Sequence, residues 1–165
     1  MGKTKSIKPR IQLGAMLVLV LLAIALLLSQ QVGPDAGPLF QLKRVQEKVF
    51  LKTKLSASSQ VDYMSNLLET RLGELQNAVN NQNYGYVLPS SLRYFTLAGQ
   101  ITDLIVANNL TSQTETIRNQ FLSHRKILDQ LYVIYPKNTD NWEWKYIKDD
   151  YNYLKLYLDK LEKVK

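Results

Sequence analysis

Residues 112–135 read SQTETIRNQFLSHRKILDQLYVIY. Within this stretch, side chains suited to a protein interior recur at alternating steps of four and three residues. They are Ile117, Phe121, His124, Leu128, Leu131 and Tyr135. This spacing places them on one face of an α-helix, and the following Pro136 ends the helix. The stretch therefore predicts a long amphipathic helix that buries one face.

The same spacing recurs on both sides of this stretch. It predicts helices over residues 39–54, 58–81 and 89–107 upstream, and from Asp140, a suitable N-cap, almost to Lys165 downstream. The expected inward positions are Leu42, Val45 and Val49; Val61, Met64, Leu68, Leu72, Leu75 and Val79; Phe95, Ala98, Ile101 and Ile105; and Trp144, Ile147, Tyr151, Leu154, Leu158 and Leu161. No segment alternates as a half-buried strand would. With short connections, the chain predicts an all-α fold, an antiparallel bundle of about five helices.

An apolar run precedes these helices. Residues 13–28, LGAMLVLVLLAIALLL, carry no charge and no side-chain hydrogen-bonding group. Extended back to Ile11, the run would form about 18 residues, or roughly 27 Å, of helix, against a hydrocarbon core of about 30 Å. The basic tail, residues 1–10, should stay in the cytoplasm. We therefore expect a transmembrane signal anchor over residues 11–29, with the C-terminal domain outside the cell membrane.

A cleaved secretory signal peptide is the alternative, because a Leu-rich core behind a basic segment fits both. Cleavage needs small residues at positions −3 and −1. Residues 29–37, SQQVGPDAG, contain no Ala-x-Ala pattern and include a proline. An uncleaved, single-pass anchor is favoured, and either alternative exports the rest of the chain.

The distribution of charge limits the partners of the exported part. Residues 30–38 form a linker rich in Gly and Pro, and residues 39–165 form the extracytoplasmic domain. The net charge of +7 comes from the N-terminal tail and from residues 43–54, because residues 55–165 contain 12 basic and 12 acidic side chains. A neutral domain lacks the basic face that phosphate binding requires, so we expect no nucleic-acid partner. The cluster within residues 43–54 fits either contact with anionic headgroups or a solvated helix face.

The start of the expected domain resembles a known family. Residues 37–49, GPLFQLKRVQEKV, are similar to the opening of a bacterial exported helical family catalogued as a domain of unknown function, which follows its anchor with Pro-Leu, a Leu-Lys-Arg triplet and a Glu-Lys or Glu-Arg pair. Residues 68–75, LETRLGEL, resemble its second helix. The Tyr- and Trp-rich C-terminal helix has no counterpart there. The resemblance implies an envelope-anchored helical domain and supplies no catalytic residues.

The sequence contains no recognisable set of catalytic or metal-binding residues. His124 is the single histidine and there is no cysteine, which leaves too few ligands for a zinc or di-iron site. We expect His124 to be a hydrogen-bonded residue of the interior. Ser123 to Lys126 match a Ser-x-x-Lys pattern, but the Ser-Asp-Asn and Lys-Thr-Gly elements that accompany it in penicillin-recognising enzymes are absent. We therefore predict no enzyme activity, no catalytic or metal-binding residues and no cofactor.

The one candidate binding face is aromatic. Trp142, Tyr146, Tyr153 and Tyr157 form a second stripe on the last expected helix, roughly 120° from its Leu stripe. Tyr and Trp are enriched at interfaces, although such a stripe also fits a second helix–helix contact. The sequence thus predicts a membrane-tethered interaction or structural module of the bacterial envelope, in contact with the lipid bilayer and with an envelope protein or polymer. The alternative is a sensor or ligand-binding module that recognises a peptide or polymer through the aromatic helix.

Overall fold

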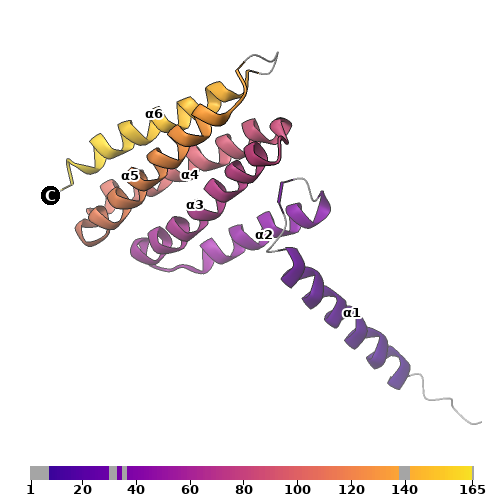
Figure 1. Ribbon diagram of the computed structural model, residues 1–165. Coiled ribbons are helices and arrows are strands. Elements are labelled where there is room, and N and C mark those ends of the chain that lie inside the picture. The colour runs from indigo at the N-terminus through magenta and orange to yellow at the C-terminus, as the bar shows by residue number, and fades with distance from the viewer. Residues whose placement is uncertain (1–7, 30–32, 35–36, 138–141, 165) are drawn as a thin grey trace, which may run out of the picture. The chain divides into compact units, whose positions relative to one another are not determined.

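The computed structural model describes residues 8–29, 33–34, 37–137 and 142–164, with no side-chain detail for 8–15 and 29 (Figure 1). All regular structure in these residues is helical. The elements are α1 (Lys8–Ser29), α2 (Pro38–Thr53), α3 (Ala57–Asn80), the short 3-10 helix η1 (Tyr84–Tyr86), α4 (Val87–Asn108), α5 (Thr111–Ile134) and α6 (Trp144–Leu161). The chain divides into two compact units, Met1–Lys48 and Val49–Lys165.

The all-α prediction is confirmed for the described residues, and the predicted helix bounds agree with the structure to within a few residues. Five helices follow α1, of which α3 to α6 pack together in the second unit. The last helix is shorter than predicted, because it begins at Trp144 and ends at Leu161. The expected N-cap Asp140 lies outside the described residues.

The four packed helices are not arranged as a simple antiparallel series. Going around the bundle, the order is α3, α4, α6, α5, so the consecutive helices α4 and α5 lie diagonally opposite each other. The contacts of α3 with α5 run in the same direction along both helices, from Ser58 with Gln113 to Glu69 with His124. Each helix therefore has one parallel and one antiparallel neighbour. Only Asn109 and Leu110 connect α4 to α5, and Asn109 adopts a left-handed conformation with φ 48°.

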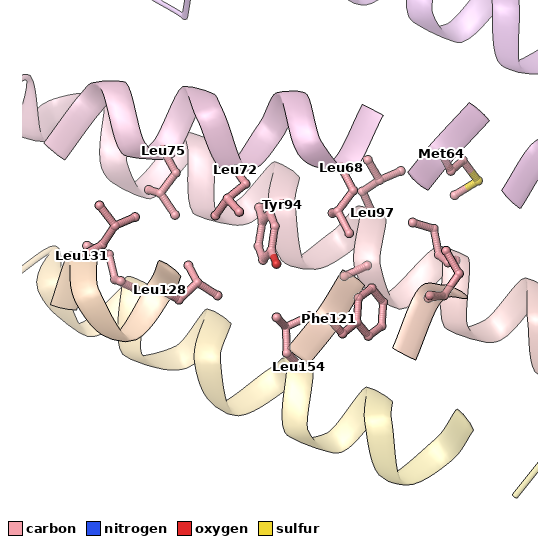
Figure 2. Close-up of a cluster of buried hydrophobic side chains, with 14 of the residues drawn as sticks. Met64, Leu68, Leu72, Leu75, Tyr94, Leu97, Phe121, Leu128, Leu131 and Leu154 are labelled. Atoms are coloured by element: carbon pink, nitrogen blue, oxygen red, sulfur yellow. The ribbon is translucent and has the colours of Figure 1, made fainter. Parts of the chain in front are cut away.

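The hydrophobic core lies between these four helices. Figure 2 shows side chains from all four meeting there, including Leu68 and Leu72 from α3, Tyr94 from α4, Phe121 from α5 and Leu154 from α6. The predicted inward positions of α3 and α5 are all buried. In α4 the prediction placed Phe95 inward, whereas Phe95 is half-buried and its neighbour Tyr94 is fully buried. Helical periodicity thus located the core to within one residue.

The first unit contains α1 and most of α2. From Met16 to Leu28, large apolar side chains of α1 are exposed all around the helix, with exposed fractions between 47% and 67%. Within the described residues, no helix is apolar over enough of its length to cross a membrane. Residues 1–7 of the predicted tail, the linker residues 30–32 and 35–36, and the side chains of residues 11–15 of the predicted anchor lie outside the described part of the chain.

The inward face predicted for α2 is not covered in the structure. Val45 and Val49, two of its three predicted inward residues, are 58% and 55% exposed, and Phe50 is 50% exposed. On an adjoining part of the helix surface, Phe40 and Lys43 are buried, with the Lys43 Nζ 5.9 Å from the centre of the Phe40 ring. The helix therefore has the predicted amphipathic pattern, but its apolar face is exposed.

Candidate functional site

The four aromatic residues predicted as a binding face occupy different environments. Trp142 precedes the first residue of α6 and is 64% exposed, so it does not share the helical face of the tyrosines. Tyr146 is half-buried, and its backbone carbonyl accepts a hydrogen bond from the Ser91 hydroxyl at 3.4 Å. The prediction placed Trp142 on the helix because Asp140 was expected to be its N-cap. A later helix start separates the indole from the stripe.

Tyr153 and Tyr157 pack against α4. The Tyr153 ring stacks on Phe95, with ring centres 4.9 Å apart, and lies 6.2 Å from the ring of Tyr157. The Tyr157 hydroxyl donates a hydrogen bond to the Phe95 carbonyl at 3.4 Å. Gly99 makes room for it, because a β-carbon at that position would lie 2.8 Å from the Tyr157 hydroxyl oxygen. Tyr157 is therefore part of the contact between α4 and α6, and Tyr153, 39% exposed, lies at its edge.

A different aromatic surface runs between α5 and α6, which we call the cation–aromatic row. Its side chains alternate between cations and rings at short distances. Arg125 lies 4.2 Å from the ring centre of Tyr151, and Lys148 lies 4.8 Å from Tyr151 and 5.0 Å from Tyr132. The row continues from Tyr132 to Trp144, at 5.9 Å, and Lys145 lies 5.6 Å from Trp144 and 3.7 Å from Trp142. Such contacts hold cations over the faces of aromatic rings.

A layer of hydrogen-bonded polar side chains runs through the bundle, and we call it the polar layer; its members are buried except Glu69, whose side chain is 58% exposed. It contains Glu69 from α3, Ser91 and Tyr94 from α4, His124 from α5 and Asp150 from α6. His124 Nε2 lies 2.8 Å from Glu69 Oε1, and Nδ1 lies 3.0 Å from the Tyr94 hydroxyl. Since a carboxylate only accepts, the Nε2–H donates to Glu69 and Nδ1 accepts from Tyr94. His124 is thus a hydrogen-bonded interior residue, as predicted.

Burial disfavours the charged forms of the groups at the centre of the polar layer. It lowers the pKa of His124, although the hydrogen bond and the charge of Glu69 act in the opposite direction. It raises the pKa of Tyr94 well above the usual value, and the charges of Asp150 and Glu69 add to this. For Glu69, burial acts to raise the pKa, but hydrogen bonds from Gln120 and His124 and the charge of His124 prevail and lower it. The negative charge of the Glu69–His124–Tyr94 chain therefore lies at its outer end.

Asp150 is the member of the layer with the fewest partners. It is fully buried, and its Oδ1 accepts a hydrogen bond from the Ser91 hydroxyl at 2.9 Å. No hydrogen-bonding group of the described residues reaches its Oδ2. Burial raises the pKa of Asp150 well above the usual value; the Ser91 hydrogen bond opposes this, and the charge of Asp149 adds to it. A buried carboxyl with an unpartnered oxygen is more stable in its neutral form.

The polar layer was missed by sequence reasoning, apart from His124. Its carboxylates carry no motif, and an Asp on a helix is usually exposed. The chemical role open to the layer is structural, because its hydrogen bonds are made between helices of the bundle. Among the described residues, no group of three or more His, Cys, Asp or Glu side chains is placed to hold a metal ion.

Comparison with known proteins assigns neither a family nor a function to this chain. No family model matches the chain, and no curated protein and no solved structure is significantly similar to it.

Proposed function

We propose that this protein is a membrane-tethered, extracytoplasmic helical module of the bacterial cell envelope, with an interaction or structural role. The observation that carries the proposal is the uncharged run of residues 13–28 behind a basic tail. A helix that is apolar all round is suited to an apolar surrounding rather than to water. The exposed side chains of α1 support this, since ten large apolar residues between Met16 and Leu28 are exposed. The bacterial setting rests on the resemblance of residues 37–49.

Export of the bundle follows from the position of the charges. The tail before the run contains Lys3, Lys5, Lys8 and Arg10. Lys and Arg residues in a short segment beside a membrane span keep that end of the span in the cytoplasm. The bundle of α3 to α6 would then face the opposite side.

The absence of cysteine allows a direct test of the tether and its orientation. We expect the full chain to stay with membranes through an alkaline carbonate wash, and its mature N-terminus to be Met1 or Gly2. A single cysteine in place of Ser112, which is exposed at the start of α5, should react with a membrane-impermeant maleimide in intact spheroplasts. A cysteine in place of Ser6 should react only after lysis. A mature N-terminus beyond residue 29, or the reverse labelling pattern, would contradict the proposal.

The second candidate is a ligand-binding module, and the cation–aromatic row favours it. This surface combines rings with the cations Arg125, Lys145 and Lys148, whereas part of the predicted stripe is used by the contact between α4 and α6. Alternating rings and cations suit an anionic polymer better than an uncharged one. An exposed Trp142 at the end of the row would give such a polymer a further apolar contact.

Intrinsic fluorescence can test this candidate, because both tryptophans of the chain, Trp142 and Trp144, lie in the row. We expect polyphosphate, used as the probe polyanion, to change the emission in a saturable way. Lys145→Gln combined with Lys148→Gln should weaken the response at least tenfold. The matched variant Lys155→Gln with Lys163→Gln, at exposed positions outside the row, should leave it unchanged. An equal loss in both variants would indicate non-specific charge attraction and would remove this candidate.

A further inference from the structure

We infer that the apolar face of α2 lies on an anionic lipid surface, at the level where α1 leaves the membrane. The inference rests on the proposed tether and adds a second membrane contact to it. It explains why Val45, Val49 and Phe50, on a helix of otherwise regular amphipathic pattern, are each at least half exposed. Leu55, just after the helix, is 98% exposed.

A hydrogen bond fixes α2 at the end of α1. The Gln46 side-chain amide donates to the backbone carbonyl of Leu26 at 3.3 Å, within the last turn of α1. Carbonyls in the last turn lack partners inside their own helix, so this contact caps the end of the anchor. The chain between Ser29 and Pro38 can span no more than about 30 Å, which also keeps α2 close to that end. If α1 spans a membrane, α2 begins at the interface.

The open face of α2 is on the same side as this contact. At 100° per residue, Val45, Val49 and Phe50 lie within about 100° of Gln46 around the helix axis, and Leu42 lies between them. Arg44 and Lys48 lie about 160° from Gln46. The side of α2 that meets the end of α1 is therefore the apolar side, and the cations point away from it or flank it. An amphipathic helix in a membrane interface has this arrangement.

The charge of α2 selects the kind of lipid. Residues 43–54 contain five cations and one acid, Glu47. Lys48 and Lys52 are exposed, so they are free to reach headgroups beside the apolar face. Lysine side chains bury their stems along apolar surface while the ammonium stays in water. Each cation near an anionic surface favours binding about fivefold. The partner is therefore a bilayer containing anionic phospholipid, rather than a second protein.

The test uses the full chain in vesicles and single-cysteine variants carrying the fluorophore NBD. The probe is placed at Val49 on the apolar face and, as a matched control, at Arg44 on the opposite face. In vesicles containing phosphatidylglycerol, we expect the Val49→Cys probe to shift to the blue and to be quenched by nitroxides on the lipid acyl chains. The Arg44→Cys probe should retain the emission of a probe in water.

The role of charge is tested in the same vesicles. Replacing phosphatidylglycerol by phosphatidylcholine should lower the ratio of buried to exposed Val49 probe. Lys48→Gln combined with Lys52→Gln should lower that ratio by about 25-fold, as two fivefold contributions imply. Lys155→Gln with Lys163→Gln, two exposed positions in the second unit, should leave it unchanged.

The outcomes separate this inference from the tether. If the chain floats with the vesicles and resists carbonate while both probes remain in water, the tether stands and the α2 contact is overturned. Quenching of both probes to the same depth would overturn the assignment of the apolar face, and equal burial in the two lipids would overturn the charge selection. If the chain is released by carbonate, the proposed function itself fails.

Discussion

At the scale of single residues, the polar layer is the least expected part of the molecule. Tyr94 and His124 are buried beside each other: the Tyr94 hydroxyl donates to His124 Nδ1, and His124 Nε2 donates to Glu69. Among the described residues, Asp150 accepts a side-chain hydrogen bond at only one of its two oxygens, from Ser91. Buried polar groups contribute to a unique arrangement when they are paired and cost stability when they are not. The two halves of the layer therefore differ in their effect on stability. The first half links α4 to α5, whereas the second places on α6 a buried carboxyl whose charged form is destabilised.

This difference predicts how stability depends on pH. The pKa of Asp150 is higher in the folded than in the unfolded chain, so the folded state holds this proton more tightly. The stability contributed by Asp150 is then present at low pH and lost as pH rises above about 4. Asp150→Asn, which is neutral throughout, should raise the free energy of unfolding at pH 8 by about 1–3 kcal/mol, and the gain should shrink toward pH 4.

Thermal or urea unfolding of the two proteins at several pH values checks this. Asp159→Asn, at an exposed position of the same helix, is the matched control and should change stability by less than about 0.5 kcal/mol. If Asp150→Asn proves less stable than the natural protein at pH 8, the carboxylate must be held in its charged form, and the assignment of a neutral Asp150 is wrong.

At the scale of the helices, the periodicity of the sequence predicted which hydrophobic residues are buried. It did not predict the rotation of each helix or which helices become neighbours. Leu68, Leu128 and Leu154 recur with the helical period, and all three are fully buried. The same rule could not separate Tyr94 from Phe95, because both adjacent residues are aromatic and the rotation of α4 depends on its neighbours. Nor could it assign the parallel pairing of α3 with α5, because a short connection such as Asn109–Leu110 does not specify which helices become neighbours.

The aromatic residues of α6 show how this limit affects a functional prediction. A stripe of Tyr on a helix is compatible with a binding face and with a second packing face, and only the neighbouring helix distinguishes them. Tyr157 occupies the space left by Gly99 and lies 6.4 Å from the ring of Phe121, while Tyr153 stacks on Phe95. These contacts indicate that the pair contributes to packing between α4 and α6.

The corresponding prediction concerns stability. Tyr153→Ser combined with Tyr157→Ser removes two rings from this contact and should lower the free energy of unfolding by at least about 2 kcal/mol, because truncating packed aromatic side chains leaves unfilled space. Trp142→Ser, at a position 64% exposed, should cost less than about 0.5 kcal/mol. Thermal unfolding followed by circular dichroism measures both. An unchanged melting temperature in the double variant would restore the stripe as a candidate binding face.

At the scale of the whole molecule, the two compact units have different sources of stability. The unit Val49–Lys165 contains the core of α3 to α6, with residues of all four helices buried together. In the unit Met1–Lys48, large side chains of α1 remain exposed, so its helices do not provide a comparable core for one another. We therefore expect the bundle to unfold as one cooperative unit, and the first unit to depend on lipid.

Hydrogen exchange on the full chain in lipid vesicles tests this division. Leu68→Ala, at a fully buried position in α3, should lower the free energy of exchange by about 2–5 kcal/mol for the slowest amides of α3, α4, α5 and α6 together. The matched variant Leu156→Ala, at a position of α6 that is 55% exposed, should change the same amides by less than about 0.5 kcal/mol. If α1 spans the membrane as proposed, its amides should exchange as in the natural protein in both variants, because a spanning helix keeps its hydrogen bonds in an apolar surrounding that excludes water. Loss of protection confined to α3 would show that the four helices do not unfold together. Faster exchange in α1 would show that the stability of α1 depends on the bundle rather than on the membrane.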